Sequence, residues 1–225
     1  MSNPSPTFVW DLHTRLFHWL LVVLISASFA TGLYGDMDWM DWHIKCGYAL
    51  LGLMFFRLYT GFVGGDYGHF SRLPLSPASA FHYVRGQQSY AGHNPLGSWM
   101  VIVMLSAITL QVLSGLLTSD DYFFEGPWVY WMDDDWVELG GQTHHVLWQF
   151  LAGFIGLHIA AVLFYQFVKK DKLVNAMVTG HKNLSNESQA VTKETRRMPL
   201  WGVCLLAALA GGSAWGLILL PSWIA

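Results

Sequence analysis

The stretch QTHHVLWQFLAGFIGLH, residues 142–158, places three histidines in a mostly apolar segment. At about 100° per residue, the 14 residues from His144 to His158 end about 40° short of four full helical turns. These two histidines therefore share one face of a helix, about 21 Å apart along its axis, while His145 points about 140° away from His158. Because a buried imidazole needs a partner, the spacing predicts two separate sites at different depths.

The composition indicates a membrane protein. The 225-residue chain is 53% hydrophobic and 12% charged, whereas soluble domains carry about 25% charged residues. Five apolar runs reach the roughly 20 residues that a helix needs to cross a bilayer. They are residues 16–34, 43–63, 96–118, 144–168 and 200–223.

We expect an all-α integral membrane protein with three parts. Residues 1–168 are predicted to form an antiparallel four-helix bundle, residues 169–198 a basic cytoplasmic linker, and residues 199–225 a peripheral fifth transmembrane helix rich in small side chains. Asn94 and Pro95 predict the cap and first turn of the third span. Residues 76–90 are expected to hold a short interfacial helix.

The charges predict which way the chain crosses the membrane. Eleven of the twelve Lys and Arg lie before the first run, near or within the connection of the second and third, or between the fourth and fifth; Lys45 is the exception. The positive-inside rule then places the N-terminus in the cytoplasm and the C-terminus outside.

The outer side is either a solvated acidic surface or a docking surface for a cationic soluble partner. Its ten carboxylates are Asp36, Asp38, Asp41, Asp120, Asp121, Glu125, Asp133, Asp134, Asp135 and Glu138.

Two further histidines match the depths of His144 and His158. With this orientation His43 begins the second span on the outer side, beside His144, and His18 begins the first span on the inner side, beside His158. Each pair then comes from two helices, as sites in bundle cores do. Zinc needs three or four protein ligands, and a proton relay favours carboxylates among the histidines.

Two axial imidazoles suit a haem iron. Two b-type haems stacked across the membrane therefore satisfy the spacing. The chain has no CxxCH motif for covalent haem attachment.

Four segments resemble the prokaryotic cytochrome b561 superfamily: RLFHW (15–19), HIKCGYALLGLMFFRL (43–58), GHNPLG (92–97) and HHVLWQFLAGFIGLH (144–158). That superfamily includes b-type subunits of nickel-iron hydrogenases and formate dehydrogenases, and the bacterial superoxide oxidase. The resemblance covers about residues 8–172 and implies a four-helix bundle with two haems b in a multi-pass protein of the bacterial inner membrane. It implies that His18, His43, His144 and His158 are the axial ligands.

Other residues are weaker candidates for haem binding. Arg15 and Arg57 lie on the inner side, where each either binds the carboxylates of the inner haem or faces lipid headgroups. Lys45 could serve the outer haem in the same way, and Gly47, on nearly the same face as His43, would let a porphyrin lie close. His13 and His145 lie next to predicted ligand positions but are not expected to be ligands themselves. The loop histidines are expected to be surface or structural groups, or one of them an aid to proton transfer at a quinone site; they are His69, His82, His93 and His181.

The leading functional expectation is an electron carrier between membrane quinol or quinone and a soluble redox partner. The acidic outer face favours a basic c-type cytochrome, and the resemblance implies a quinone site near the inner haem. The alternative is a superoxide oxidase that reduces quinone, although the outer carboxylates would repel the superoxide anion. A third reading is a non-redox transporter or structural membrane protein. The expected surroundings are membrane lipid, and no nucleic-acid partner is expected.

Overall fold

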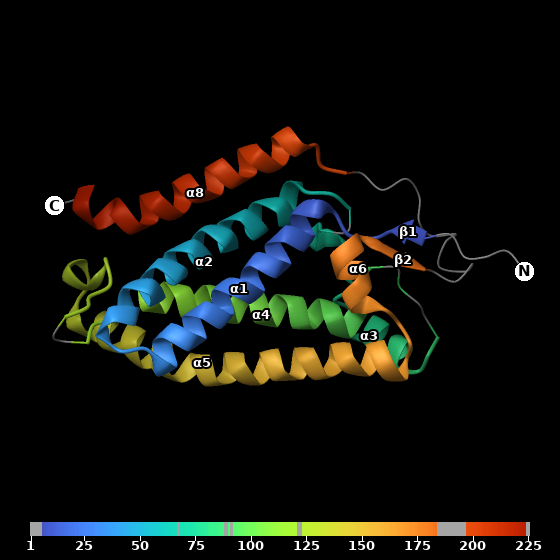
Figure 1. Ribbon diagram of the computed structural model, residues 1–225, viewed down its shortest axis with the longest axis horizontal. Coiled ribbons are helices and arrows are strands. Elements are labelled where there is room, and N and C mark those ends of the chain that lie inside the picture. Colours follow the sequence, from blue (N-terminus) through green and yellow to red (C-terminus); the bar gives the residue numbers. More distant parts are fainter. Residues whose placement is uncertain are drawn as a thin grey trace, which may run out of the picture.

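Five long helices dominate the computed structural model, which describes residues 6–66, 68–87, 90, 92–120, 123–183 and 197–223 (Figure 1). They are α1 (Leu12–Tyr34), α2 (Met37–Val63), α4 (Pro95–Gly115), α5 (Asp134–Leu163) and α8 (Leu200–Trp223). Each is long and apolar enough to cross a membrane. The predicted all-α membrane class and its five spans are confirmed.

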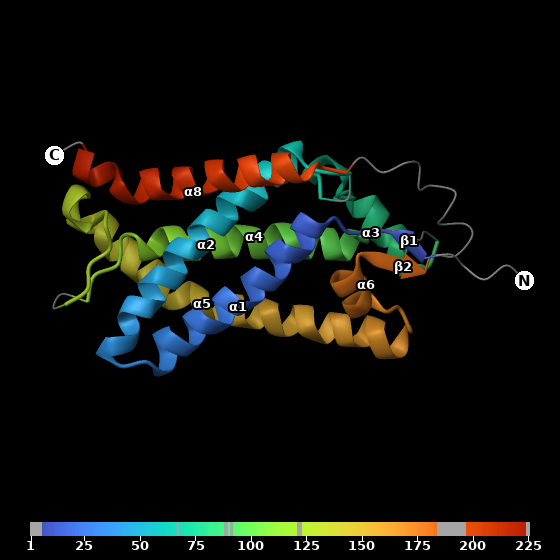
Figure 2. The ribbon, with the colours of Figure 1, turned by 45° about the horizontal axis from the view of Figure 1, so that its top comes forward.

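Helices α1, α2, α4 and α5 form the bundle, and α8 lies beside it along α2 (Figures 1 and 2). Helix α2 packs extensively against both α8 and α1, α4 packs against α5, and α2 also contacts α4. The buried centre is apolar and is formed mainly by Leu50 and Leu51 of α2, Ile108 and Val112 of α4, and Leu151 of α5. Large apolar side chains also cover the outer faces of the helices, as a lipid environment requires.

The bundle has two chemically different ends. The acidic end holds the α1–α2 turn and the connection 116–133, and the basic end holds α3 (Pro77–Val84), α6 (Leu173–Thr179) and the strands β1 (Pro6–Phe8) and β2 (His181–Asn183) (Figure 1). At the acidic end, residues 118–120 and 123–126 lie against each other: the Gly126 amide donates to the Thr118 carbonyl at 2.8 Å, and Ser119 pairs with Glu125. We call the described residues 118–120 and 123–126 the acidic hairpin.

Capping at the basic end follows the sequence expectations. The Asn94 side chain accepts a hydrogen bond from the Gly97 amide at 2.8 Å, and Pro95 is the first residue of α4; both expectations are confirmed. The expected interfacial helix is α3, shorter than residues 76–90. The Tyr83 hydroxyl ties α3 to its neighbours, because it lies 2.8 Å from the Tyr165 hydroxyl and accepts from Asn94 at 3.0 Å. Burial and the contact with Tyr165 raise the pKa of Tyr83.

Part of the expected linker is folded against the N-terminus. Strand β2 pairs antiparallel with β1, and the Gly180 carbonyl accepts from the amides of Val9 and Trp10. Gly180 has φ +82°, and a Cβ there would lie 2.9 Å from the Trp10 carbonyl oxygen, so only glycine suits this turn. The Arg15 side chain adds a hydrogen bond to the Val178 carbonyl. Residues 184–196 of the linker lie outside the described residues.

Among the described residues, two polar contacts hold helix α8 to the bundle, besides its small buried residues Ala210 and Ala214. The Tyr59 and Ser213 hydroxyls are 2.7 Å apart. Pro221 has no amide hydrogen, so it leaves the carbonyl of Leu217, four residues earlier, without its helical donor. The indole Nε1 of Trp128, which follows the acidic hairpin, donates to that carbonyl at 3.0 Å.

We expect Trp128→Phe to loosen both α8 and the acidic hairpin. The substitution keeps an aromatic ring but strands the Leu217 carbonyl, which should cost about 1 kcal/mol of the free energy of unfolding. Hydrogen–deuterium exchange should quicken in residues 116–131 and in the second half of α8. The matched control is Trp215→Phe, because Trp215 is 61% exposed on α8. Equal exchange in the two variants would contradict this role.

Candidate functional site

Near the acidic end, His43 of α2 and His144 of α5 face one another across the bundle. Their ring centres are 6.1 Å apart, with an interplanar angle of 89°. The Nδ1 atom of His43 lies 3.0 Å from the Ser28 carbonyl, and that of His144 lies 2.9 Å from the Gln111 carbonyl. A carbonyl can only accept, so each Nδ1 carries the hydrogen and each Nε2 keeps a free lone pair. Metal-binding histidines are oriented in this way.

Two glycines allow the rings to lie against neighbouring helices. A Cβ on Gly32 of α1 would lie 2.7 Å from Cε1 of His43, and one on Gly115 of α4 would lie 3.0 Å from Cε1 of His144. Neither distance leaves room for a methyl group without moving the imidazole. These two glycines and the carbonyls of Ser28 and Gln111 were not predicted, because no local pattern in the sequence marks them.

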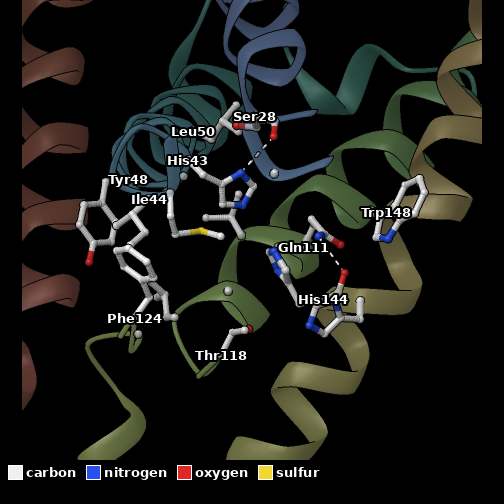
Figure 3. A pocket seen from close by; sticks show the side chains of 18 of the residues that line it. Ser28, His43, Ile44, Tyr48, Leu50, Gln111, Thr118, Phe124, His144 and Trp148 are labelled. Atoms are coloured by element: carbon white, nitrogen blue, oxygen red, sulfur yellow. Dashed lines mark hydrogen bonds between the residues drawn. The ribbon is translucent and has the colours of Figure 1, made fainter. Parts of the chain in front are cut away.

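An apolar cavity of about 320 Å³ opens between the two histidines (Figure 3). Its walls include Phe29, Leu50 and Trp148, and the acidic hairpin covers part of it through Phe124. Gly47 also lines it, and a Cβ there would have no neighbour within 4 Å. The cavity has the size and apolar character of a small-molecule or cofactor site.

Closer to the basic end, His18 of α1 and His158 of α5 form the second facing pair. Their ring centres are 6.4 Å apart, with an interplanar angle of 52°. His18 Nδ1 is buried and has no hydrogen-bond partner among the described residues. The structure thus brings together the two pairs that the spacing and the orientation predict.

The predicted cationic neighbours occupy different surroundings. Arg57 is buried, and its guanidinium carbon lies 4.5 Å from the centre of the Phe70 ring. Arg15 is directed instead to the Val178 carbonyl, and Lys45 is exposed, with its ammonium 4.9 Å from the Trp42 ring. A role of any of the three in binding haem carboxylates stays a prediction.

The expected bystander histidines also differ from one another. His145 is exposed at the edge of the cavity. His13 is only 4% exposed, and its buried Nε2 has no partner among the described residues. His93 packs edge-on against Trp10 at 4.6 Å. Burial and the nearby charges of Arg57 and His158 lower the pKa of His93 to about 4, so its imidazole is neutral near pH 7. A role of His93 in proton transfer at a quinone site stays a prediction.

A helical membrane protein in which half-buried imidazoles face each other in pairs has the arrangement of a membrane cytochrome. The chain belongs to the family described as prokaryotic cytochrome b561, which it matches over residues 9–180. It is therefore a multi-pass bacterial membrane protein and a b-type cytochrome of electron transfer, and the family implies haem b as its cofactor.

Curated relatives agree with this family. The chain is 22% identical to a probable Ni/Fe-hydrogenase B-type cytochrome subunit of Rhizobium leguminosarum bv. viciae, over 78% of this chain and 88% of the relative. It is 23% identical to the protein of the same name in Azotobacter vinelandii, over 83% and 92% of the two chains. No solved structure gave a significant match.

Proposed function

We propose that the chain binds two haems b, one between His43 and His144 and the other between His18 and His158. A metal–imidazole bond is about 2 Å long, and a ring centre lies about 1 Å beyond the bonded nitrogen. Two imidazoles on opposite sides of one iron therefore have centres about 6 Å apart. The observed separations of 6.1 and 6.4 Å carry the proposal.

The donor set also fits a haem better than a bare metal ion. Among the described residues, no three His, Cys, Asp or Glu side chains are grouped as a metal-ion site would need, whereas a haem takes only two axial ligands from the protein. The Nε2 atoms of His43 and His144 are free, since both Nδ1 atoms donate to carbonyls. The apolar walls and Gly47 leave space for a flat ring beside this pair.

Two haems at different depths would let electrons cross the membrane. His144 and His158 are separated by 14 residues of continuous helix, or about 21 Å. Each bound haem would supply a one-electron change at its iron. The chain's part is to hold each ring between two imidazoles and to keep water out with buried side chains such as Leu151, which lies between the two levels. We propose membrane quinol or quinone as one electron carrier and a soluble protein as the other.

The soluble partner is proposed to dock at the acidic end. This end has nine exposed carboxylates among the described residues, whereas Lys45 is its single cation there. Such a surface attracts a basic partner, and we propose a c-type cytochrome. The positive-inside rule then puts this end in the periplasm and the N-terminus in the cytoplasm, across the bacterial inner membrane. The names of the relatives make a nickel-iron hydrogenase the second candidate partner.

The decisive test is a redox titration of the purified full-length protein. We expect an absorption spectrum with two b-type haems per chain, reduction by a soluble quinol, and reoxidation by a basic c-type cytochrome. Fewer than two haems per chain would contradict the two-site proposal. Full reduction by quinol without reoxidation by the cytochrome would agree with the two haem sites but contradict a c-type cytochrome as the partner. A nickel-iron hydrogenase would then be the next partner to test.

Replacing Asp133, Asp134 and Asp135 together by Asn should slow electron transfer to a basic cytochrome c. These residues begin α5 at the acidic end and are exposed. We expect a rate about tenfold lower at low salt, because steering by charge is weakened. The difference should nearly vanish at about 1 M salt, where the Debye length is about 3 Å. Ferricyanide, an anion, is the control oxidant, and its reduction should not slow. A loss that does not depend on salt would contradict docking by charge.

A further inference from the structure

Arg57 is a buried cation in the interior of the bundle. The residue is 6% exposed, and its guanidinium carbon lies between two aromatic rings, 4.5 Å from the centre of Phe70 and 6.0 Å from that of Phe17. Among the described residues, no carboxylate forms an ion pair with it. Burying a charge is costly unless the charge is paired, so the site is suited to an anion.

Arg57 lies at the level of the second histidine pair. It follows His43 by 14 residues in α2, just as His158 follows His144 by 14 residues in α5. The two helices run in the same direction, from the acidic end to the basic end (Figure 1). A 14-residue step keeps the helix face to within about 40° and advances about 21 Å. Since His43 and His144 face each other, Arg57 and His158 reach the same depth, and Arg57 is on the face of α2 that His43 uses.

His13 and His93 are two further polar groups near this end of the bundle. His13 lies one helical turn before Phe17, is 4% exposed, and has a buried Nε2 without a partner among the described residues. His93 lies in the loop before α4, where it packs edge-on against Trp10, and the charges of Arg57 and His158 both lower its pKa. A neutral imidazole offers one N–H donor, and a guanidinium offers five in a planar fork.

We propose that Arg57, assisted by His13 and His93, binds a carboxylate of the haem held by His18 and His158. The inference rests on the proposed haem sites and adds residues that the sequence assigned to bystander or loop roles. Arginine binds carboxylates in two-pronged geometry, and such charge-assisted hydrogen bonds are the strong ones. Arg15, the other candidate, donates through one terminal nitrogen to the Val178 carbonyl, while its buried Nε has no partner among the described residues. Arg57 is a positioning residue here, because it acts on the haem through its carboxylate and not on the iron.

The test compares Arg57→Gln and Arg57→Lys with the control Arg72→Gln in full-length, haem-loaded protein. Arg72 is a neighbouring arginine whose side chain is 68% exposed. In Arg57→Gln we expect a lower midpoint potential for one haem only, because a nearby cation favours the reduced form. We expect that haem to transfer to apomyoglobin about tenfold faster or more. Arg57→Lys should recover most of both effects, and Arg72→Gln should show neither.

Loading the protein with haem b dimethyl ester, which has no free carboxylates, identifies the anion. Wild type and Arg57→Gln should then lose the ester at equal rates. An Arg57→Gln protein that loses the ester faster than wild type, as it loses haem b, would overturn the proposal in favour of a structural role or a free anion. The shift should persist in a His43→Ala background, where the other site is disabled, and its absence there would also overturn the proposal. If wild type itself holds no haem at His18 and His158, the proposed function fails instead, which the haem count shows separately.

Should Arg57→Gln fold poorly, His13→Leu provides the second variant. This substitution removes the imidazole N–H donor and puts an apolar side chain of similar length in its buried position. We expect a smaller downward shift in the potential of the same haem, with the other haem as an internal control. An unchanged potential would remove His13 from the site.

Discussion

Replacing His158 with alanine should leave a protein with one haem instead of two. His158 faces His18 at 6.4 Å between ring centres, so its loss takes away one of the two axial nitrogens that would hold the second haem. The reduced α-band should fall by about half, because two similar haems contribute similar absorbance. Reduction by quinol followed by transfer to a cytochrome should also fail, since the remaining haem reaches only one side of the membrane.

The neighbouring doublet provides the control for that experiment. His145→Ala changes a histidine beside a proposed ligand, but His145 is exposed and points away from His158, so both haems should remain. His18→Ala should match His158→Ala, and the double variant should lose no more than either single variant. Retention of two haems by His158→Ala would contradict the proposed pairing.

Gly32→Ala is expected to damage the site at His43 and His144 without destabilising the chain. Its new Cβ would lie 2.7 Å from Cε1 of His43, and the ring cannot turn aside without giving up the Ser28 carbonyl that now accepts from its Nδ1. Changes in the groups that orient a metal ligand typically weaken metal binding 10- to 100-fold. We therefore expect a loss of this order in the affinity for the haem at His43 and His144.

The expected stability separates this effect from misfolding. Alanine favours a helix over glycine by about 0.5–1 kcal/mol, so the thermal stability of the haem-free chain should not fall. Gly212→Ala in α8 is the matched control, because a Cβ there meets nothing within 4 Å; it should keep both haems. Equal haem binding by the two variants would show that His43 does not need the close approach at Gly32.

The helices, the acidic and basic ends and the facing histidines could be predicted from sequence because each follows from residues that are neighbours along the chain. Apolar runs of about 20 residues determine where spans lie, and the 3.6-residue period determines that His144 and His158 share a face. The Asn94–Pro95 cap is equally local, and the structure has it where the sequence predicts it. Combining span order with the positive-inside rule then predicts which histidines meet at each depth.

The role of the basic segment after α5 was harder to predict. Composition marks residues 169–198 as polar and charged, which is typical of a linker. The structure instead uses its first part to form α6 and β2 against β1. That contact joins residues more than 170 positions apart, and a short strand with a distant partner leaves no periodic signal of its own.

By itself the sequence determined the five membrane helices, the acidic and basic ends, and the depth at which each histidine lies, because helix period and hydrophobicity are properties of neighbouring residues. Only the tertiary structure decided that Ser28 and Gln111 orient the imidazoles at the acidic end, that Trp128 holds α8 through the carbonyl freed by Pro221, and that Arg57 is buried beside Phe70. Those contacts depend on the rotation and offset of packed helices. Rotation and offset are set by how all the side chains at an interface fit together, which no single segment of the chain contains.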